Sequence, residues 1–139
     1  MIRFILDTDH LSLFQRSHTA VTERVKSLPP EVLAITIVTV EEQLRGRLAQ
    51  IKVARNAVEF SLAYQRLNQA VEELAAFTRL PYDEAAHHHF LHLKSLKLRV
   101  GTQDLRIAAI ALARDCALVT RNTQDFQAIP RLTLADWSR

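Results

Sequence analysis

The chain has 139 residues, of which 48% are hydrophobic and 24% charged, with 18 basic against 15 acidic side chains. This composition excludes a disordered chain and predicts a single domain over residues 1–139, and the net charge of +3 permits a polyanionic partner such as nucleic acid. One cysteine, Cys116, excludes an internal disulfide and a cysteine-based zinc cage, and the lack of a long apolar run excludes a transmembrane helix or signal peptide, so we expect a cytoplasmic protein.

The first part of the chain predicts two buried strands, each followed by helices. Residues 2–6 form an apolar run that ends at Asp7, and residues 32–37 form a second such run. Asp9 can cap a short helix through residue 16, and another helix is predicted over residues 20–27. Thr39 is then expected to open a helix as part of a capping box with Glu42.

A long helical stretch is predicted over residues 51–77, with a break near Asn56. One apolar stripe runs along it at alternating steps of three and four residues: Phe60, Ala63, Leu67, Ala70, Leu74 and Phe77. Residues 78–80 predict a short strand before Pro81. Asp83 is expected to cap a helix that ends near Leu98.

The last part of the chain returns to the alternation of helix and strand. A helix that is apolar nearly all round is predicted over residues 102–113, followed by strands at 117–120 and 132–134. Strands separated by helices predict an α/β fold with a parallel sheet covered on both faces.

In such a sheet the ligand site lies beyond the carboxyl ends of the strands. The polar side chains at these ends are Asp7 and Asp9 after the first strand, Glu41 and Glu42 after the second, Asp104 at the start of a helix, and Asn122 and Asp125 after the third clear strand. Gathered carboxylates repel one another unless a cation lies between them, and oxygen ligands suit Mg²⁺ or Mn²⁺.

Each acid also has a structural interpretation when it is taken alone. Glu42 fits the capping box with Thr39, and Asp104 occupies a first helical turn, where the helix dipole favours acids. Asp7 is the exception, because a carboxylate at the end of a buried strand needs a partner. The coincidence of several acids at matching ends therefore favours a shared cation.

Other chemically active residues favour structural roles. His88 and His92 share a helical face within a histidine-rich run, but they lack further ligands for a zinc site, so an exposed surface facing RNA or a partner is expected. Cys116 is expected in the core, and Trp137 is expected to anchor the C-terminal segment by packing.

Four segments, in order along the chain, resemble the sequence blocks of the PIN-domain nuclease family. They are ILDTDHLS at 5–12, ITIVTVEEQLRG at 35–46, GTQDLRIAA at 101–109 and LVTRNTQDF at 118–126. The ending PRLTLADW at 130–137 resembles the tail of VapC-type toxins. In the second block, the acid four residues before Gly46 is Glu42, so Glu42 rather than Glu41 matches the family's acid.

The resemblance implies a PIN-like, three-layer α/β/α fold with a mainly parallel sheet of four to five strands. It also implies a Mg²⁺- or Mn²⁺-dependent endoribonuclease, the toxin of a type II toxin–antitoxin pair. Asp7, Glu42 and Asp104 match the three core acids, as catalytic residues and metal ligands. Many family members have an acid where this chain has Asn122. Asn122 is then a neutral metal ligand, Asp125 serves as the fourth catalytic acid, or a site of three acids suffices.

The same resemblance implies an RNA substrate, a cognate antitoxin, a homodimer and a toxin–antitoxin hetero-oligomer, without a membrane partner. The apolar stripe between Arg45 and Phe77 offers a groove for an antitoxin helix. A basic antitoxin side chain among Asp7, Glu42 and Asp104 would neutralise these acids and inhibit the nuclease.

Two alternatives to this function remain. The neutral Asn122 is compatible with a PIN-like module that binds RNA or an antitoxin and has little or no catalysis. A haloacid-dehalogenase-like phosphatase also begins with a strand and Asp-x-Asp, as Asp7 and Asp9 do here, but Leu11 stands where that enzyme needs Thr or Val.

Overall fold

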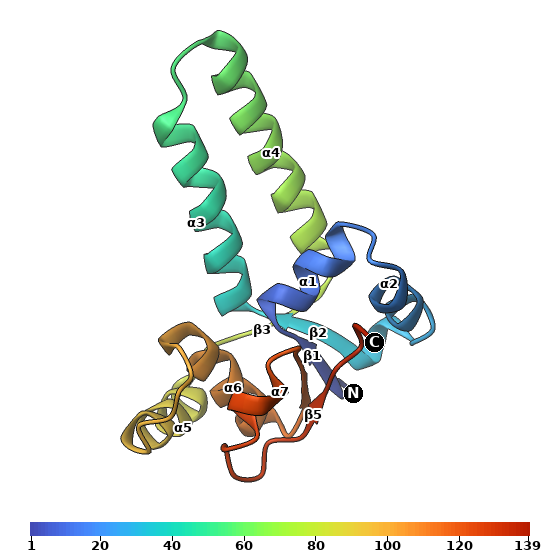
Figure 1. The fold of residues 1–139 in the computed structure, drawn as a ribbon, viewed down its shortest axis with the longest axis vertical. Helices are drawn as coiled ribbons and strands as arrows, with labels where there is room; N and C mark the ends of the chain where they lie inside the picture. The colour runs from blue at the N-terminus through green and yellow to red at the C-terminus, as the bar shows by residue number, and fades with distance from the viewer.

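The computed structural model describes residues 1–139 and has a five-stranded parallel sheet between layers of helices (Figure 1). The strands lie in the order β3-β2-β1-β4-β5 and comprise β1 (Phe4–Leu6), β2 (Leu33–Thr36), β3 (Thr78–Leu80), β4 (Ala117–Val119) and β5 (Leu134–Ala135). All four strand pairs are parallel. The predicted α/β fold with a parallel sheet of four to five strands is confirmed.

Seven α-helices and one 3₁₀ helix connect the strands. They are α1 (Thr8–Gln15), α2 (Thr19–Lys26), the 3₁₀ helix (Pro30–Val32), α3 (Ile37–Val53), α4 (Ala57–Ala75), α5 (Glu84–Ser95), α6 (Thr102–Arg114) and α7 (Thr123–Phe126). None of these helices combines the length and the apolarity that a membrane crossing requires.

The alternation of side chains along the strands divides the core into two clusters. Ile5 of β1 packs with α5 and α6, whereas Leu6 faces the opposite side, with α1, α2 and the end of α4. Trp137 closes the second cluster and meets Phe4 edge to face, with ring centroids 5.2 Å apart. Cys116 is buried in the first cluster. The structural interpretations of Trp137 and Cys116 are thus confirmed.

Two predicted helix caps are wrong because both helices begin earlier than expected. Asp7, not Asp9, caps α1, and its Oδ1 accepts from the His10 amide at 2.8 Å. Thr36, not Thr39, caps α3, and its hydroxyl accepts from the Thr39 amide at 3.2 Å. In both places the helix follows the strand without a connecting loop, so the last strand residue or its neighbour caps the helix and the expected caps fall inside the first turn.

Helices α3 and α4 form a long hairpin that projects away from the sheet (Figure 1). The predicted break near Asn56 is confirmed, since the Asn56 side chain accepts from the Glu59 amide at 2.9 Å and caps α4. The apolar stripe is buried only in part: Ala63 is 5% exposed, whereas Phe60 is 42% exposed. The outer half of the hairpin extends beyond the sheet, so only α3 and α4 cover one another there. The last strand begins at Leu134 rather than at residue 132.

Candidate active site

Three acids from distant parts of the chain meet at the carboxyl edge of the sheet. Asp7 follows β1 and is 6% exposed, Glu42 lies in the second turn of α3, and Asp104 lies in the first turn of α6. Burial raises the pKa of Asp104 from 3.8 to about 6, and the charges of Asp7, Glu42 and then Asp9 add to the shift. The acids are therefore close enough to repel one another in the absence of a cation.

Asp7 is held in place by the main chain on both sides of its carboxylate. Its amide donates to the Val119 carbonyl of β4 at 3.0 Å, and its Oδ1 accepts from the His10 amide. The same oxygen lies 3.5 Å from Nδ1 of the His10 ring. Because Oδ1 is occupied in this way, the other carboxylate oxygen remains available for a ligand.

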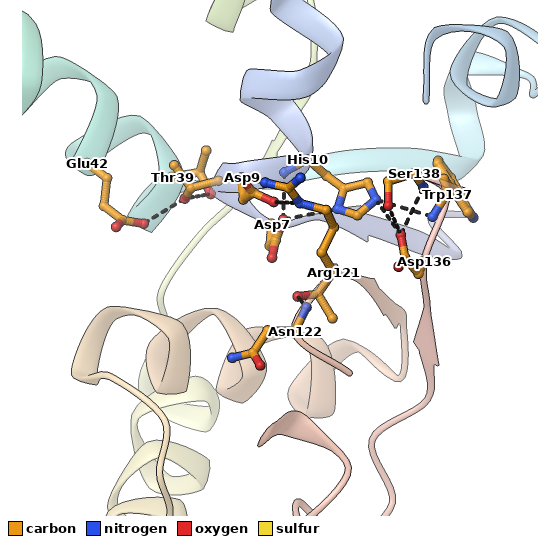
Figure 2. Close-up of polar contacts among 12 residues, drawn as sticks. Asp7, Asp9, His10, Thr39, Glu42, Arg121, Asn122, Asp136, Trp137 and Ser138 are labelled. Atoms are coloured by element: carbon orange, nitrogen blue, oxygen red, sulfur yellow. Dashed lines mark hydrogen bonds and ion pairs between the residues drawn. The ribbon is translucent and has the colours of Figure 1, made fainter. Parts of the chain in front are cut away.

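Glu42 is oriented by a short chain of hydroxyl groups. Its Oε1 accepts from the Thr8 hydroxyl at 2.6 Å, and the Thr8 and Thr39 hydroxyl oxygens lie 3.0 Å apart (Figure 2). A hydroxyl carries one proton, so Thr8, which donates to Glu42, accepts from Thr39. The sequence does not mark this chain of hydroxyl groups, because the interpretation of Thr39 as a helix cap left its hydroxyl out of the site.

Asp9 lies at the rim of the cluster and is paired with a base. Arg121, which follows β4, donates to both of its carboxylate oxygens at 2.7 and 2.9 Å (Figure 2). Arg121 has no motif that marks it in the sequence, and the pair spans 112 residues. The pair neutralises Asp9 and leaves Asp7, Glu42 and Asp104 as the unpaired acids.

Asn122 and Asp125 occupy different positions relative to the cluster. The backbone amide of Asn122 donates to the Thr120 hydroxyl at 3.0 Å, and the Asn122 side chain makes no capping hydrogen bond to α7 (Figure 2). Asp125 lies in the four-residue helix α7 and is not among the charges that raise the pKa of Asp104. The Asn122 side chain is thus free of hydrogen bonds to α7, and Asp125 adds no charge to the cluster around Asp104.

Glu41, the neighbour of Glu42, faces another direction. It pairs with Arg45 at 2.7 Å and accepts from the Gln103 side chain at 2.8 Å. It is therefore a surface residue that joins α3 to α6, in agreement with the choice of Glu42 as the motif acid.

His10 is a buried residue near the site that the sequence did not single out. Its ring is fully buried, and its Nε2 accepts from the Trp137 amide at 3.2 Å (Figure 2). Nε2 accepts the hydrogen bond through a lone pair, so Nδ1 is the nitrogen that carries the proton. Nδ1 has no hydrogen-bond partner and lies 3.5 Å from Asp7 Oδ1. The ring therefore lies between the C-terminal segment, to which it is hydrogen-bonded, and the carboxylate of Asp7.

Asp136 completes this connection. Burial favours a higher pKa for Asp136, but hydrogen bonds from the Ser138 hydroxyl and amide, together with the positive charges of a protonated His10 and of Arg139, hold the pKa below its ordinary value. Asp136 thus remains ionised 3.5 Å from His10 Nε2.

The donor set fits a hard divalent cation surrounded by water. Asp7, Asp9 and His10 form the one set of three acidic or histidine groups whose ligand atoms all lie within 4.8 Å of one another, but Asp9 is taken up by Arg121. Asp7, Glu42 and Asp104 surround a wider space, which suits Mg²⁺ or Mn²⁺ that keeps several water ligands. A cation there would offset the repulsion that adds to the effect of burial on the pKa of Asp104.

The histidine-rich run of α5 does not form such a set. His88 and His92 are exposed, and the His87 Nδ1 lies 2.9 Å from the Tyr82 hydroxyl. This arrangement agrees with the predicted exposed surface.

Proteins similar to this chain were found both by sequence and by structure, although no protein-family model matches it. Ribonuclease VapC1 of Haemophilus influenzae is 25% identical, with 98% of each chain aligned, and the tRNA(fMet)-specific endonuclease VapC of Salmonella typhimurium is 29% identical, with 99% aligned. The crystal structure of DNA-bound VapBC from Salmonella typhimurium matches with a TM-score of 0.77 at 28% identity over 99% of both chains. VapBC-1 from nontypeable Haemophilus influenzae matches with a TM-score of 0.74 at 26% identity over the full length of both chains. The resemblance predicted from the four sequence blocks is thereby confirmed.

Proposed function

We propose that this chain, a relative of VapC-type PIN-domain nucleases over its whole length, is a Mg²⁺- or Mn²⁺-dependent endoribonuclease. The observation that carries the proposal is the convergence of Asp7, Glu42 and Asp104: burial raises the pKa of Asp104 to about 6, and the charges of Asp7 and Glu42 add to this shift. A cluster of unpaired acids destabilises a fold unless it binds a cation, so its presence favours a metal-dependent reaction. The names of the curated relatives, ribonuclease and endonuclease, support RNA as the substrate.

The three acids have separate roles in this proposal. Asp7 and Asp104 would hold the cation, Glu42 would help to hold it, and Asn122 would be a neutral ligand. When bound, the cation supplies charge neutralisation at the scissile phosphate. Glu42 is fixed by Thr8 through one oxygen, and its other oxygen orients the attacking water. In-line attack then leaves a 3′-hydroxyl and a 5′-phosphate.

The partners follow from the structures that resemble this chain. The solved relatives are VapBC complexes of toxin–antitoxin systems, and we therefore propose that this chain is a type II toxin held by an antitoxin in a hetero-oligomer that also contains a toxin homodimer. The antitoxin inhibits by placing a basic side chain among the three acids, since a guanidinium neutralises them and displaces the cation. Exposed apolar residues on the hairpin, such as Val53, Val58 and Tyr64, support a partner surface there.

Cleavage of RNA by the purified chain in Mg²⁺ and in EDTA tests the proposed function. We expect cleavage in Mg²⁺ only, and a loss of at least about a hundredfold in Asp104→Asn, because that variant keeps its shape but loses a ligand charge. The Asp125→Asn variant is the matched control and should retain activity if Asn122 fills the fourth position.

Two results would contradict the proposal. Cleavage by Asp104→Asn at the parental rate would reduce Asp104 to a helix-start residue without a catalytic role. RNA binding without any metal-dependent cleavage by the parent would instead favour the catalytically inactive binding module.

A further inference from the structure

A polar hollow of about 530 Å³ opens between α1, α3 and α4, next to the acid cluster. Figure 1 shows α1 at the foot of the hairpin, beside the sheet ends of α3 and α4. Thr8 and Glu42, which belong to the acid cluster, also line the hollow. A molecule lying in the hollow would therefore have one end at the candidate active site.

Where the three helices border the hollow, the faces that they turn toward it are polar. Of its thirteen lining residues, Ala70 is the single hydrophobic one. The lining follows helical spacing on each helix: Thr8, Ser12 and Gln15 on α1, with Arg16 directly after it; Glu42, Gln43, Gly46, Arg47 and Gln50 on α3; Arg66, Gln69, Ala70 and Glu73 on α4. Inward helix faces are ordinarily apolar, so this polar lining is not explained by packing.

Three arginines in the hollow have no acidic partner. The arginines that pair with carboxylates in this chain are Arg45, Arg114, Arg121 and Arg139. Arg16, Arg47 and Arg66 are outside that set, although each lines the hollow. Arg45 and Arg47 lie two residues apart on α3, yet only the one that faces away from the hollow is paired. Free guanidinium groups around a polar hollow are suited to bind phosphate.

Because Gly46 has no side chain, α3 does not project into the hollow at this position, next to Glu42. Gly46 is four residues after Glu42 and so lies on the same face of α3. A Cβ built on Gly46 would meet nothing within 4 Å, so packing does not require glycine. Glycine inside a helix costs about 0.5–1 kcal/mol relative to alanine, and the open space it leaves belongs to the hollow.

We propose that this hollow holds the sugar–phosphate backbone of the single-stranded RNA substrate, with Arg16, Arg47 and Arg66 as phosphate contacts that lead the strand to the acid cluster. This inference rests on the proposed ribonuclease function. The polar lining argues against an apolar antitoxin helix as the occupant, because such a helix would leave the guanidinium groups buried without partners.

The reciprocal pair of Gln15 and Gln43 sets the width of this path. Each amide donates to the other across the gap between α1 and α3, at 2.9 and 2.8 Å. Each side chain still has one N–H and one carbonyl lone pair free. The pair thus joins the two walls and leaves polar groups for the sugar hydroxyls of the strand.

RNA affinity measured without cleavage tests this path separately from the catalytic function. A labelled single-stranded RNA is titrated with the full chain in EDTA over a range of salt concentrations. We expect Arg47→Gln and Arg66→Gln each to weaken binding by about threefold or more and to lower the salt slope by about 0.7. Lys52→Gln removes the same charge from the exposed side of α3, outside the hollow, and should bind within about twofold of the parent.

A pair of substitutions at Gly46 separates charge from shape. Gly46→Glu and Gly46→Gln add side chains of equal size, but only the first adds a negative charge to the hollow. We expect Gly46→Glu to weaken RNA binding about tenfold more than Gly46→Gln and to raise KM in Mg²⁺ with little change in kcat. Thermal unfolding checks that both variants are folded.

Three outcomes would overturn the inference. If the parent cleaves RNA and all these variants bind RNA as the parent does, the strand takes another path while the ribonuclease function stands. If the variants lose affinity for the purified antitoxin and keep their RNA affinity, the hollow belongs to the antitoxin. If the parent neither binds nor cleaves RNA, the inference fails together with the proposed function.

Discussion

The two ends of α3 differ in which side chains are buried: polar ones are buried at the sheet end, and apolar ones are exposed at the outer end. At the sheet end, Thr36 and Thr39 are fully buried, and each takes part in a hydrogen bond that serves the helix start or the acid cluster. At the outer end, Val53 is 72% exposed, and the next helix begins with Val58 at 78%. At the sheet end, buried polar groups are therefore hydrogen-bonded. At the outer end, apolar side chains are exposed to solvent, as is typical of a surface that binds another protein.

Both ends depart from what stability alone would favour, but for different reasons. The sheet end gathers like charges around Asp104, which a cation would neutralise. The outer end leaves apolar area in water, which another protein would cover. The contrast predicts that substitutions at the sheet end change stability and cleavage strongly, while those at the outer end change neither.

The largest effect on stability is expected at His10, the buried link between Asp7 and the C-terminal segment. His10→Ala removes a fully buried ring and leaves the Trp137 amide without its acceptor. We expect a loss of about 2–4 kcal/mol in the free energy of unfolding, measured by urea denaturation. The control is His88→Ala on the exposed face of α5, for which a change within about 0.5 kcal/mol is expected. Equal stability of the two variants would remove His10 from this role.

The next effect concerns the hydroxyl chain that orients Glu42. Thr8→Val keeps the shape of the side chain but removes the hydrogen bond of 2.6 Å to the carboxylate. Because partners that orient a ligand typically contribute ten- to hundredfold, we expect kcat to fall about tenfold while the chain remains folded. Thr8→Ser keeps the hydroxyl and should recover most of the rate in the same assay. A Thr8→Val variant with parental kcat would show that Glu42 does not need this orientation.

The sequence predicted the acids of the site better than it predicted what surrounds them. Asp7 and Asp104 could be placed because parallel topology brings the carboxyl ends of strands and the starts of helices to one edge. The pair of Asp9 with Arg121 and the contact of His10 with Trp137 join residues 112 and 127 positions apart, and no local pattern marks either. These contacts depend on the path of the chain after β4 along the sheet edge, and the hydrophobic periodicity of the sequence does not predict that path.

The cap errors have a related cause. Ser, Thr, Asp and Asn all make good caps, so a sequence with Asp7 and Asp9, or with Thr36 and Thr39, offers two candidate starts. The observed start in each pair is the earlier one, since the sheet fixes where the strand must end. The hollow was also beyond prediction, because its polar rows come from three helices and look like ordinary solvent-exposed faces in the sequence.

A smaller effect is expected in the pH dependence of stability. Asp104 has a folded-state pKa of about 6 against an ordinary value of 3.8, so the folded chain binds more protons between these values. The contribution of Asp104 to the free energy of unfolding is therefore fully present below pH 3.8 and is lost as the pH rises through about 6. Asp104→Asn removes that loss and should gain about 1 kcal/mol over the parent at pH 7, after allowance for its partial exposure to solvent, and little at pH 4.

Urea denaturation of both proteins at pH 4 and 7, in EDTA and in Mg²⁺, measures this difference. Mg²⁺ should stabilise the parent at pH 7 and reduce the advantage of the Asn variant, because the cation offsets the same repulsion. A parent–variant difference that is the same at both pH values would mean that the acids do not repel one another as described.

The smallest effect is expected at the outer end of the hairpin, where one substitution can be compared at two positions. Val→Thr replaces a methyl group by a hydroxyl of similar size, so its effect reports whether the side chain is in water. At Val58, which is 78% exposed, we expect a change in stability within about 0.5 kcal/mol and unchanged RNA cleavage. At Val21, which is fully buried in α2, the same substitution buries a hydroxyl and should cost about 1–3 kcal/mol. If Val58→Thr destabilises the isolated chain as much as Val21→Thr does, the outer hairpin is already covered, most simply by a second copy, and the loss should then depend on protein concentration.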